Sequence, residues 1–191
     1  MTKAELRKLF IKKRSELDSS QRMALSERIT ENLFDSLNFK SLSSVHCYLP
    51  MENNNEPETG LIIERIRQDF AQIAVYVPRV DFRSDEIESI LLDSKTKLTK
   101  NRWGIPEPLN GKTAEPEIFD LVIVPLVCFD KSGNRVGYGK GFYDRFLSRC
   151  RKDCIKAGLS FFPPVESISD IHPGDIRLDI CFTPEKTYFF N

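Results

Sequence analysis

The sequence lacks an excess of charge of either sign and lacks long apolar runs. Lys and Arg number 28, and Asp and Glu also number 28, so the formal net charge is zero. Because a basic charge and aromatic RNA motifs mark most nucleic-acid-binding domains, their absence argues against a nucleic-acid partner. No apolar run approaches the roughly 20 residues of a membrane-spanning helix, and the charged N-terminal segment has no signal-peptide core. We therefore expect a cytoplasmic protein without membrane segments.

Metal-binding residues of the zinc type are also scarce. The chain has five cysteines and two histidines. Cys150 and Cys154 are close in sequence, but no second Cys or His pair stands near them to complete a tetrahedral zinc site. An odd number of cysteines without an export signal predicts reduced thiols. We expect His46 to be a structural residue within a strand and His172 to be a loop residue rather than a catalyst.

The pattern of apolar residues predicts an α/β fold. The 191 residues fit a single domain, 1–191, with a sizeable core. Nearly continuous apolar runs alternate with segments of helical spacing, which is typical of one layered domain with a mainly parallel central sheet flanked by helices. This architecture is shared by sugar-phosphate isomerases and CoA-transferases. The predicted strands are 45–49, 73–77, 87–92, 121–127, 155–161, 178–182 and 186–190, and the predicted helices begin near residues 3, 19, 61 and 140.

The N-terminal segment predicts a capped helix with a basic face. Thr2 and Glu5 have the spacing of a capping box, and a second cap follows at Asp18. Lys3, Arg7 and Arg14 share one face of the predicted helix. Such a face is either solvated or reaches across to bound phosphates, and the spacing alone favours a solvated face.

A glycine-rich stretch lies between a predicted strand and a predicted helix. It reads Asn134-Arg-Val-Gly-Tyr-Gly-Lys-Gly-Phe-Tyr-Asp-Arg145. Its alternating glycines let backbone N–H groups approach an anion, and the following helix N-terminus adds partial positive charge. Arg135 and Lys140 add full charges, and Asp144 can hold a hard cation against phosphates. The stretch is therefore either a phosphate site or a glycine-rich turn with solvated charges.

The whole string is more specific than its glycines, whose spacing matches neither standard nucleotide-binding motif. With aromatic residues at 138, 142 and 143, it resembles the signature of the 5-formyltetrahydrofolate cyclo-ligase (methenyltetrahydrofolate synthetase) family. The preceding Asp120-Leu-Val-Ile-Val-Pro125 and Phe129-Asp-x-x-Gly133 resemble that family's approach to the loop. The resemblance extends over nearly the whole chain and is strongest at 118–145.

The resemblance implies an enzyme that uses ATP and Mg²⁺ to cyclise 5-formyltetrahydrofolate to 5,10-methenyltetrahydrofolate, as a monomer with small-molecule substrates alone. It implies that Arg135 and Lys140 are catalytic and that Asp144 and Asp175 bind the metal. It assigns ATP binding to Lys3, Arg7, Arg135, Val136, Gly137, Tyr138, Gly139, Lys140, Gly141, Phe142 and Tyr143.

For the folate, the resemblance implies contacts from Leu49, Glu56, Trp103 and Tyr143. Glu56 lies in the polar loop 51–59, and a carboxylate can accept paired hydrogen bonds from a 2-amino-pyrimidinone edge. Trp103, the single tryptophan, is either a packing anchor of the Pro-containing loop 101–108 or a platform for the flat pterin. The resemblance favours the platform.

Two other classes of function remain open. A non-catalytic nucleotide- or folate-binding protein would bind either ligand without consuming it, but the intact cations and carboxylate of 135–144 argue against a lost activity. A sugar-phosphate isomerase or CoA-transferase would use a Glu or Asp base and no ATP, so product analysis would separate it from a cyclo-ligase.

Overall fold

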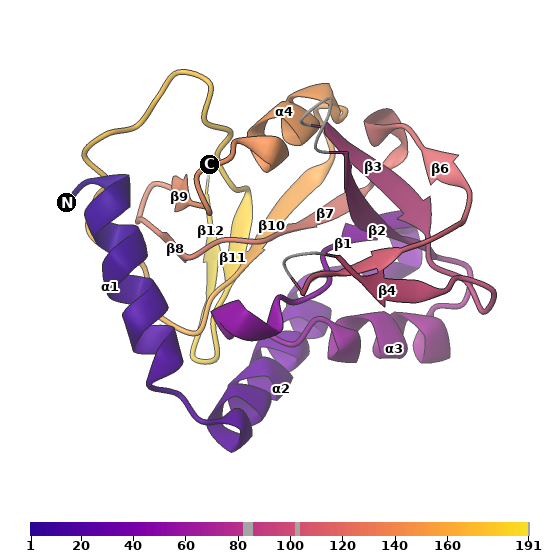
Figure 1. The fold of residues 1–191 in the computed structure, drawn as a ribbon, viewed down its shortest axis with the longest axis horizontal. Helices are drawn as coiled ribbons and strands as arrows, with labels where there is room; N and C mark the ends of the chain where they lie inside the picture. The colour runs from indigo at the N-terminus through magenta and orange to yellow at the C-terminus, as the bar shows by residue number, and fades with distance from the viewer. Residues whose placement is uncertain (82–85, 102–103, 191) are drawn as a thin grey trace.

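The computed structural model describes residues 1–81, 86–101 and 104–190. The strands of its large sheet are Ser44–Cys47 (β1), Ala74–Asp81 (β2), Glu86–Leu91 (β3), Thr113–Ala114 (β6), Leu121–Val124 (β7), Ile155–Leu159 (β10), Ile180–Phe182 (β11) and Thr187–Phe189 (β12). In the described residues these strands form one sheet in the order β12-β11-β10-β7-β1-β2-β3-β6 (Figure 1). Strands β11, β10, β7, β1 and β2 are parallel, and β12, β3 and β6 are antiparallel to their neighbours. The predicted mainly parallel α/β fold is confirmed.

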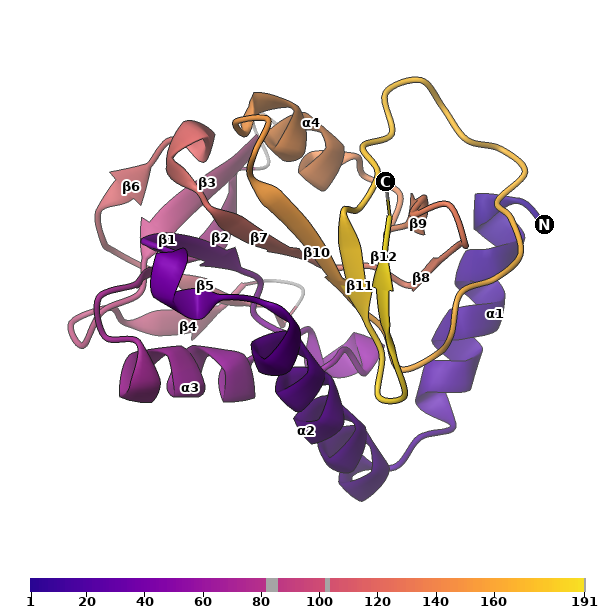
Figure 2. The same cartoon turned by 180° about the vertical axis from the view of Figure 1, so that it is seen from behind.

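Helices cover both faces of this sheet (Figures 1 and 2). The α-helices are Lys3–Ser15 (α1), Ser19–Ser36 (α2), Gly60–Asp69 (α3) and Phe142–Arg149 (α4), and the short 3-10 helices are Phe39–Ser41 (η1), Glu52–Asn54 (η2) and Pro116–Ile118 (η3). Thr2 and Asp18 cap α1 and α2 with complete capping boxes, so both predicted caps are confirmed. None of the helices in the described ranges combines the length and apolar character that crossing a bilayer requires.

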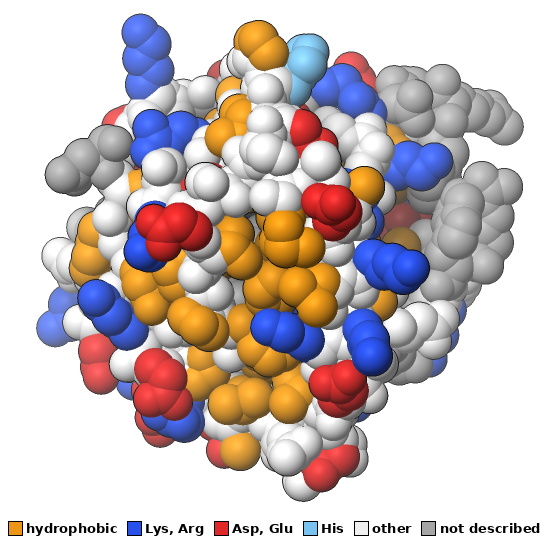
Figure 3. Space-filling view, turned by 90° about the vertical axis from the view of Figure 1, so that its left-hand side faces the viewer, with side chains coloured by type: hydrophobic (Ala, Val, Ile, Leu, Met, Phe, Trp, Pro, Cys, Tyr) orange, Lys and Arg blue, Asp and Glu red, His pale blue; other side chains and the backbone are white. Residues whose placement is uncertain are grey.

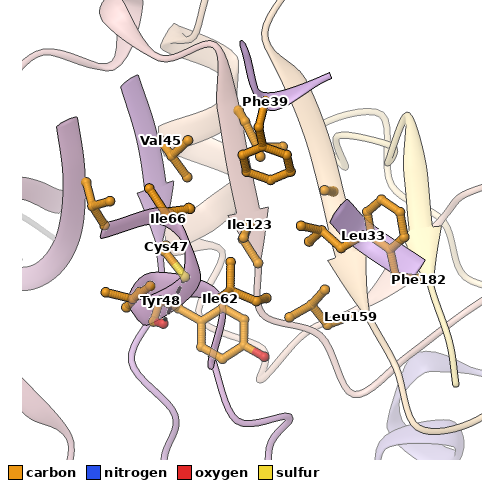
Figure 4. Close-up of a cluster of buried hydrophobic side chains, with 14 of the residues drawn as sticks. Leu33, Phe39, Val45, Cys47, Tyr48, Ile62, Ile66, Ile123, Leu159 and Phe182 are labelled. Carbon is orange, nitrogen blue, oxygen red and sulfur yellow. Dashed lines mark hydrogen bonds between the residues drawn. The ribbon is translucent and has the colours of Figure 1, made fainter. Parts of the chain in front are cut away.

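The core consists of apolar layers on the two faces of the sheet. Because successive strand residues point to opposite faces, Leu121 and Ile123 of β7 join the cluster under α2 and α3, whereas Val122 and Val124 join the cluster under α4. Figure 4 shows the first cluster, in which Leu33 from α2 lies among sheet residues. Truncating such a fully buried leucine to alanine typically lowers the unfolding free energy by about 2–5 kcal/mol. The packed layers therefore hold the strands, and with them the strand ends that carry the site, in place.

The predicted strand 121–127 is too long, because β7 ends at Val124. The next residue, Pro125, has no N–H to continue the ladder. The chain then forms a separate hairpin, Cys128–Phe129 (β8) and Arg135–Val136 (β9), that the sequence analysis did not predict. Within its turn, the buried carboxylate of Asp130 accepts hydrogen bonds from the backbone of Ser132 and Asn134. The second strand of the hairpin begins the glycine-rich stretch, which then leads into α4.

Most other boundaries lie within two residues of prediction, but two features differ more. The strand predicted to stop at Pro78 continues to Asp81, because β1 pairs with β2 only through Tyr76 and a proline is tolerated where one side of a strand has no partner. Part of the predicted loop 101–108 is a strand, Pro106–Pro108 (β5), which pairs with Leu98–Lys100 (β4). Residues 82–85, between the predicted strands 73–77 and 87–92, lie outside the described residues.

Helix α1 lies apart from the other helices, beside the β8–β9 hairpin (Figure 1). It buries Leu6 and Phe10 against a third apolar cluster that includes Val136. Figure 3 views the molecule from this end and shows hydrophobic side chains in the middle of the face with charged side chains around them. The packing of α1 on the hairpin brings its basic face to the glycine-rich stretch.

Candidate active site

Apart from Lys3 and Arg7 on α1, the predicted site residues that the structure describes lie on segments that follow the carboxyl ends of parallel strands. The polar loop with Glu56 follows β1, and the glycine-rich stretch follows β7 and the β8–β9 hairpin. Ligands of open α/β sheets bind at this edge. Residues 160–179, which include Asp175, follow β10 and reach the same region, because Ile176 N–H donates to Asp144 at 3.0 Å. The structure therefore brings together segments that are far apart in sequence.

The glycine-rich stretch has the backbone of an anion-binding turn. Gly139 and Gly141 have φ values of +93° and +69°, in the region that favours glycine. Gly141 is the N-cap of α4, so the free N–H groups of that helix begin at the stretch. A Cβ built on Gly137 would contact no described atom within 4 Å, so the backbone there is open to close approach. These features suit a phosphate group.

Helix α1 lies over this stretch through its basic face. Arg7 Nε donates to the carbonyl of Gly137 at 2.8 Å, and its guanidinium lies 3.5 Å from the position of a Cβ on Gly139. Lys3 forms an ion pair with Asp175. The solvated-face interpretation is therefore wrong for Arg7, which contacts the stretch directly. Binding of ATP by Lys3 and Arg7 stays a prediction.

Arg135 is buried beneath the stretch rather than exposed on it. Its Nη2 lies 2.7 Å from Asp144 Oδ1, and its Nη1 donates to the carbonyl of Ile176. Burial lowers the pKa of Arg135, and the neighbouring Asp144 carboxylate opposes that shift. The guanidinium holds α4 to the segment after Asp175. Its predicted contact with phosphate stays a prediction, whereas Lys140 is exposed and free to reach a ligand.

Asp144 and Asp175 fit the donor set of a magnesium ion. Asp144 accepts hydrogen bonds at Oδ1, and Asp175 accepts from Lys3 and from His172 N–H at Oδ2. Burial works to raise the pKa of Asp175, but these hydrogen bonds and the positive charges of Lys3 and Arg135 together lower it. In the described ranges no third His, Cys, Asp or Glu completes a metal cluster. Mg²⁺ typically takes one or two carboxylates and completes its octahedron with water and phosphates, so this pair suits a phosphate-bound ion.

Glu56 is buried at the junction of the polar loop and the glycine-rich stretch. The hydroxyl of Tyr138 donates to Oε1 at 2.6 Å, and Met51 N–H donates to Oε2 at 2.7 Å. Burial raises the pKa of Glu56, and the two hydrogen bonds act against that rise. Each carboxylate oxygen has two lone pairs, so each can accept one further hydrogen bond. A residue predicted for ATP, Tyr138, thus contacts a residue predicted for folate.

The other predicted folate residues differ in position. Tyr143 lies under the site, with its hydroxyl 3.4 Å from His46 Nε2. His46 is fully buried, and burial lowers its pKa to about 3, so it is a neutral structural residue as predicted. Leu49 is half-buried and packs against the core under α2 and α3. Trp103 lies outside the described residues. Val136 is fully buried, which leaves only its backbone for a nucleotide, whereas Phe142 is partly exposed.

Arg14 was placed on the basic face of the first helix by the sequence analysis but was given no role in the site. It is only 1% exposed, and it donates to the hydroxyl of Tyr138 at 3.1 Å. The solvated-face interpretation is therefore wrong for Arg14 as well. Its place on the same helical face as Lys3 and Arg7 was the available signal, because Arg7 on that face also contacts the glycine-rich stretch.

Comparison with known proteins gives a consistent result. The model of the 5-formyltetrahydrofolate cyclo-ligase family matches residues 1–168. A 5-formyltetrahydrofolate cyclo-ligase from Mus musculus is 32% identical over 142 residues, covering 70% of this chain and 68% of the mouse protein. One from Mycoplasma pneumoniae is 28% identical over 187 residues, covering 97% of this chain and all of that protein.

Solved structures agree with the sequence matches. The structure of a 5,10-methenyltetrahydrofolate synthetase from Aquifex aeolicus superposes with a TM-score of 0.85 at 31% identity, covering 100% of this chain and 94% of the other. A structure from Mycoplasma pneumoniae with the same name superposes with a TM-score of 0.76 at 28% identity, covering 97% of this chain and 100% of the other. The likeness therefore extends over nearly the whole chain.

Proposed function

Since the chain belongs to the 5-formyltetrahydrofolate cyclo-ligase family, we propose that it catalyses the ATP-dependent cyclisation of 5-formyltetrahydrofolate to 5,10-methenyltetrahydrofolate, with release of ADP and phosphate. The observation that carries the proposal is the 2.6 Å hydrogen bond from Tyr138 to Glu56. It joins a loop suited to phosphates to a carboxylate suited to a pterin. Two substrates held at such a junction are in position to react with each other.

The chemistry explains why ATP is consumed. A formamide oxygen is a poor leaving group, and its carbon is a poor electrophile. Transfer of the γ-phosphoryl group from ATP to the formyl oxygen forms a P–O bond, releases ADP and makes the formyl carbon electrophilic. The folate N10 then attacks that carbon, loses its proton and closes the five-membered ring, and the C–O bond breaks to release phosphate.

Phosphoryl transfer depends on positioning and on charge stabilisation more than on a covalent nucleophile. The backbone N–H groups of 137–141 would hold the phosphates, with Lys140 as the exposed cation beside the transferred group. Arg7 would fix this loop through the carbonyl of Gly137, where it donates at 2.8 Å. Arg135 would act from below by keeping Asp144 in place through their ion pair.

Magnesium is part of the proposal. Asp144 and Asp175 would hold the ion, which when bound neutralises charge on the phosphates. Both carboxylates are fixed by neighbouring cations, Asp144 by Arg135 and Asp175 by Lys3. These pairs orient the acceptor oxygens without the need for further protein ligands.

We also propose that the enzyme works as a cytoplasmic monomer. Every side chain given a role here belongs to one chain and lies around one edge of one sheet, so a second copy is not needed to complete the site. Light scattering across the concentrations of the assay tests this, because activity that appears only with a dimer peak would contradict it.

The reaction is tested by mixing purified protein with 5-formyltetrahydrofolate, ATP and Mg²⁺ and following the near-ultraviolet band of the methenyl product. Growth of the band that requires ATP, with one ADP formed per product, is the expected result. Saturable binding of ATP or folate without product would instead indicate a binding protein. Turnover of a sugar phosphate or a CoA ester without ATP would indicate the isomerase or transferase alternative.

A further inference from the structure

Arg14, near the end of α1, is a buried cation with no role in the site described so far. Its side chain is enclosed by the chain around Pro125 and by the glycine-rich stretch. Nη1 donates to the hydroxyl of Tyr138 at 3.1 Å, and Nη2 donates to the carbonyls of Leu126 and Val127, the latter at 3.2 Å. Nε is buried without a hydrogen-bond partner among the described residues. Burying a guanidinium in this way is costly unless it is well paired, so its position calls for an explanation.

The hydrogen bonds around Tyr138 have a fixed direction. Arg14 can only donate, so the Tyr138 hydroxyl accepts from it and must use its single proton toward Glu56 Oε1, 2.6 Å away. A cation, a hydroxyl and a carboxylate in series polarise one another and strengthen the chain of hydrogen bonds. The three residues therefore form one unit, here called the Arg14–Tyr138–Glu56 relay, that joins α1, the glycine-rich stretch and the polar loop.

Arg14 also holds the polar loop from a second side. Its backbone carbonyl accepts a hydrogen bond from Asn55 Nδ2 at 3.2 Å, and Asn55 directly precedes Glu56. Asn55 has a φ of +46°, an unusual conformation for a residue other than glycine. This conformation turns the chain at the point where Glu56 points inward, and Arg22 contacts the Asn55 side chain as well.

We propose that Arg14 is a positioning residue for the reduced folate, which acts through Tyr138 to fix the orientation of Glu56 toward the pterin. This inference rests on the proposed function and adds to it a residue that contacts neither substrate. Through the relay, the loop that receives ATP and the carboxylate that receives folate are held as one unit. Loss of the relay should therefore affect folate binding more than ATP binding.

Charge gives the inference a second observable. Among the described residues, Arg14 on α1 and Tyr138 on the glycine-rich stretch act on Glu56, and burial together with the Glu56 carboxylate in turn raises the pKa of Tyr48 after β1 and of Tyr143 on α4. Burial raises the pKa of Glu56, and the positive charge of Arg14 opposes that rise. Without this charge the carboxylate would protonate at higher pH, and a protonated Glu56 could no longer accept paired hydrogen bonds from the pterin.

The test compares Arg14→Met, Arg14→Lys and Tyr138→Phe with wild type, and uses Lys12→Met, an exposed position on the same helix, as the matched control. In Arg14→Met we expect the KM for 5-formyltetrahydrofolate to rise about tenfold or more, as for loss of a hydrogen bond to a charged group, with a much smaller change in the KM for ATP. The acid limb of kcat/KM for folate should move to higher pH. Arg14→Lys should keep that limb near the wild-type position, because it keeps the charge.

Tyr138→Phe removes only the hydroxyl in the middle of the Arg14–Tyr138–Glu56 relay. It therefore tests whether the relay orients Glu56 even if Arg14→Met fails to fold. It should raise the folate KM in the same direction, and the double variant should lose less than the product of the two single effects. A wild-type folate KM and acid limb in both single variants, or a loss of thermal stability alone, would overturn the inference. Calorimetric binding of 5-formyltetrahydrofolate is measured in parallel. If the wild-type protein binds 5-formyltetrahydrofolate but does not turn it over, the proposed reaction is wrong, and the binding affinities of the variants still test the role of Arg14. If the wild-type protein binds no folate, both the proposed reaction and the role of Arg14 are wrong.

Discussion

The ammonium of Lys3 and the carboxylate of Asp175 form an ion pair between residues 172 positions apart in the sequence. The two side chains are 20% and 23% exposed, so the pair is partly screened by water. Asp175 also accepts a hydrogen bond from His172 N–H at 2.7 Å. The pair fastens the first turn of α1 to the segment that precedes β11, and it places one predicted nucleotide residue directly against one predicted magnesium ligand.

Separate substitutions at this pair should therefore produce different kinetic defects. Asp175→Asn should raise the Mg²⁺ concentration for half-maximal activity by at least about tenfold. Loss of a residue that only hydrogen-bonds a metal ligand typically weakens metal binding by about tenfold or more, and loss of a ligand itself should weaken it at least as much. Lys3→Met should chiefly raise the KM for ATP. Both variants should lose no more than about 1 kcal/mol of unfolding free energy, since the pair is partly exposed. Equal Mg²⁺ dependence in Asp175→Asn and wild type would remove Asp175 from the metal site.

The two cations predicted to be catalytic should respond differently to truncation. Lys140→Ala should lower kcat/KM, through a loss of about 2–4 kcal/mol of transition-state stabilisation. Because Lys140 is exposed, the unfolding free energy should stay within about 0.5 kcal/mol of wild type. Arg135 is buried against Asp144. Arg135→Ala should destabilise the fold by about 2–4 kcal/mol, because it leaves Asp144 and the Ile176 carbonyl without their cationic donor. Urea unfolding beside steady-state kinetics separates the two effects, and wild-type kinetics in Lys140→Ala would exclude its catalytic role.

Local patterns predicted the elements whose causes are local. The caps at Thr2 and Asp18 depend on residues three positions apart, and both formed as the sequence indicated. The β8–β9 hairpin was missed because strands of two residues have no measurable periodicity, and its position depends on the break at Pro125.

Burial of charge could not be predicted in the same way. Arg14 is buried because carbonyls more than 100 positions later in the chain accept its hydrogen bonds. Arg135 was predicted to contact phosphate, which stays a prediction, and only the fold shows that its side chain pairs with Asp144. Several of the predicted site residues thus lie close together, whereas the direction of each side chain depends on contacts made only in the fold.

The glycines of the glycine-rich stretch allow a test of whether a phosphate group comes close to the backbone there. Gly139 has a φ of +93°, so Gly139→Ala should cost about 1–2 kcal/mol of stability from backbone strain. Gly137 has no such conformation, and an added Cβ would contact no described atom. Gly137→Ala should therefore fold normally but raise the KM for ATP, if phosphate approaches that backbone as proposed. Unchanged ATP kinetics in the stable Gly137→Ala variant would move the phosphates away from Gly137.

His46 gives a prediction for the pH dependence of stability. It is fully buried between Ser89, whose hydroxyl lies 3.0 Å from Nδ1, and Tyr143. Burial lowers its pKa from 6.5 to about 3. Between those values the unfolded chain binds a proton that the folded protein does not, so unfolding takes up protons and stability rises as pH rises. At pH 5 the folded state should have lost about 2 kcal/mol relative to neutral pH through this residue.

Replacing the imidazole should remove this part of the pH dependence. His46→Gln should lower stability at neutral pH, because the glutamine cannot replace the ring contacts with Phe119 and Phe146. Its unfolding free energy should nevertheless fall less steeply than that of wild type between pH 7 and pH 5. His172→Gln, at an exposed position, serves as the control and should retain the wild-type slope. Urea unfolding at several pH values measures all three proteins. Parallel curves for His46→Gln and wild type would show that His46 takes up its proton inside the folded protein, which is incompatible with a neutral ring held between Ser89 and Tyr143.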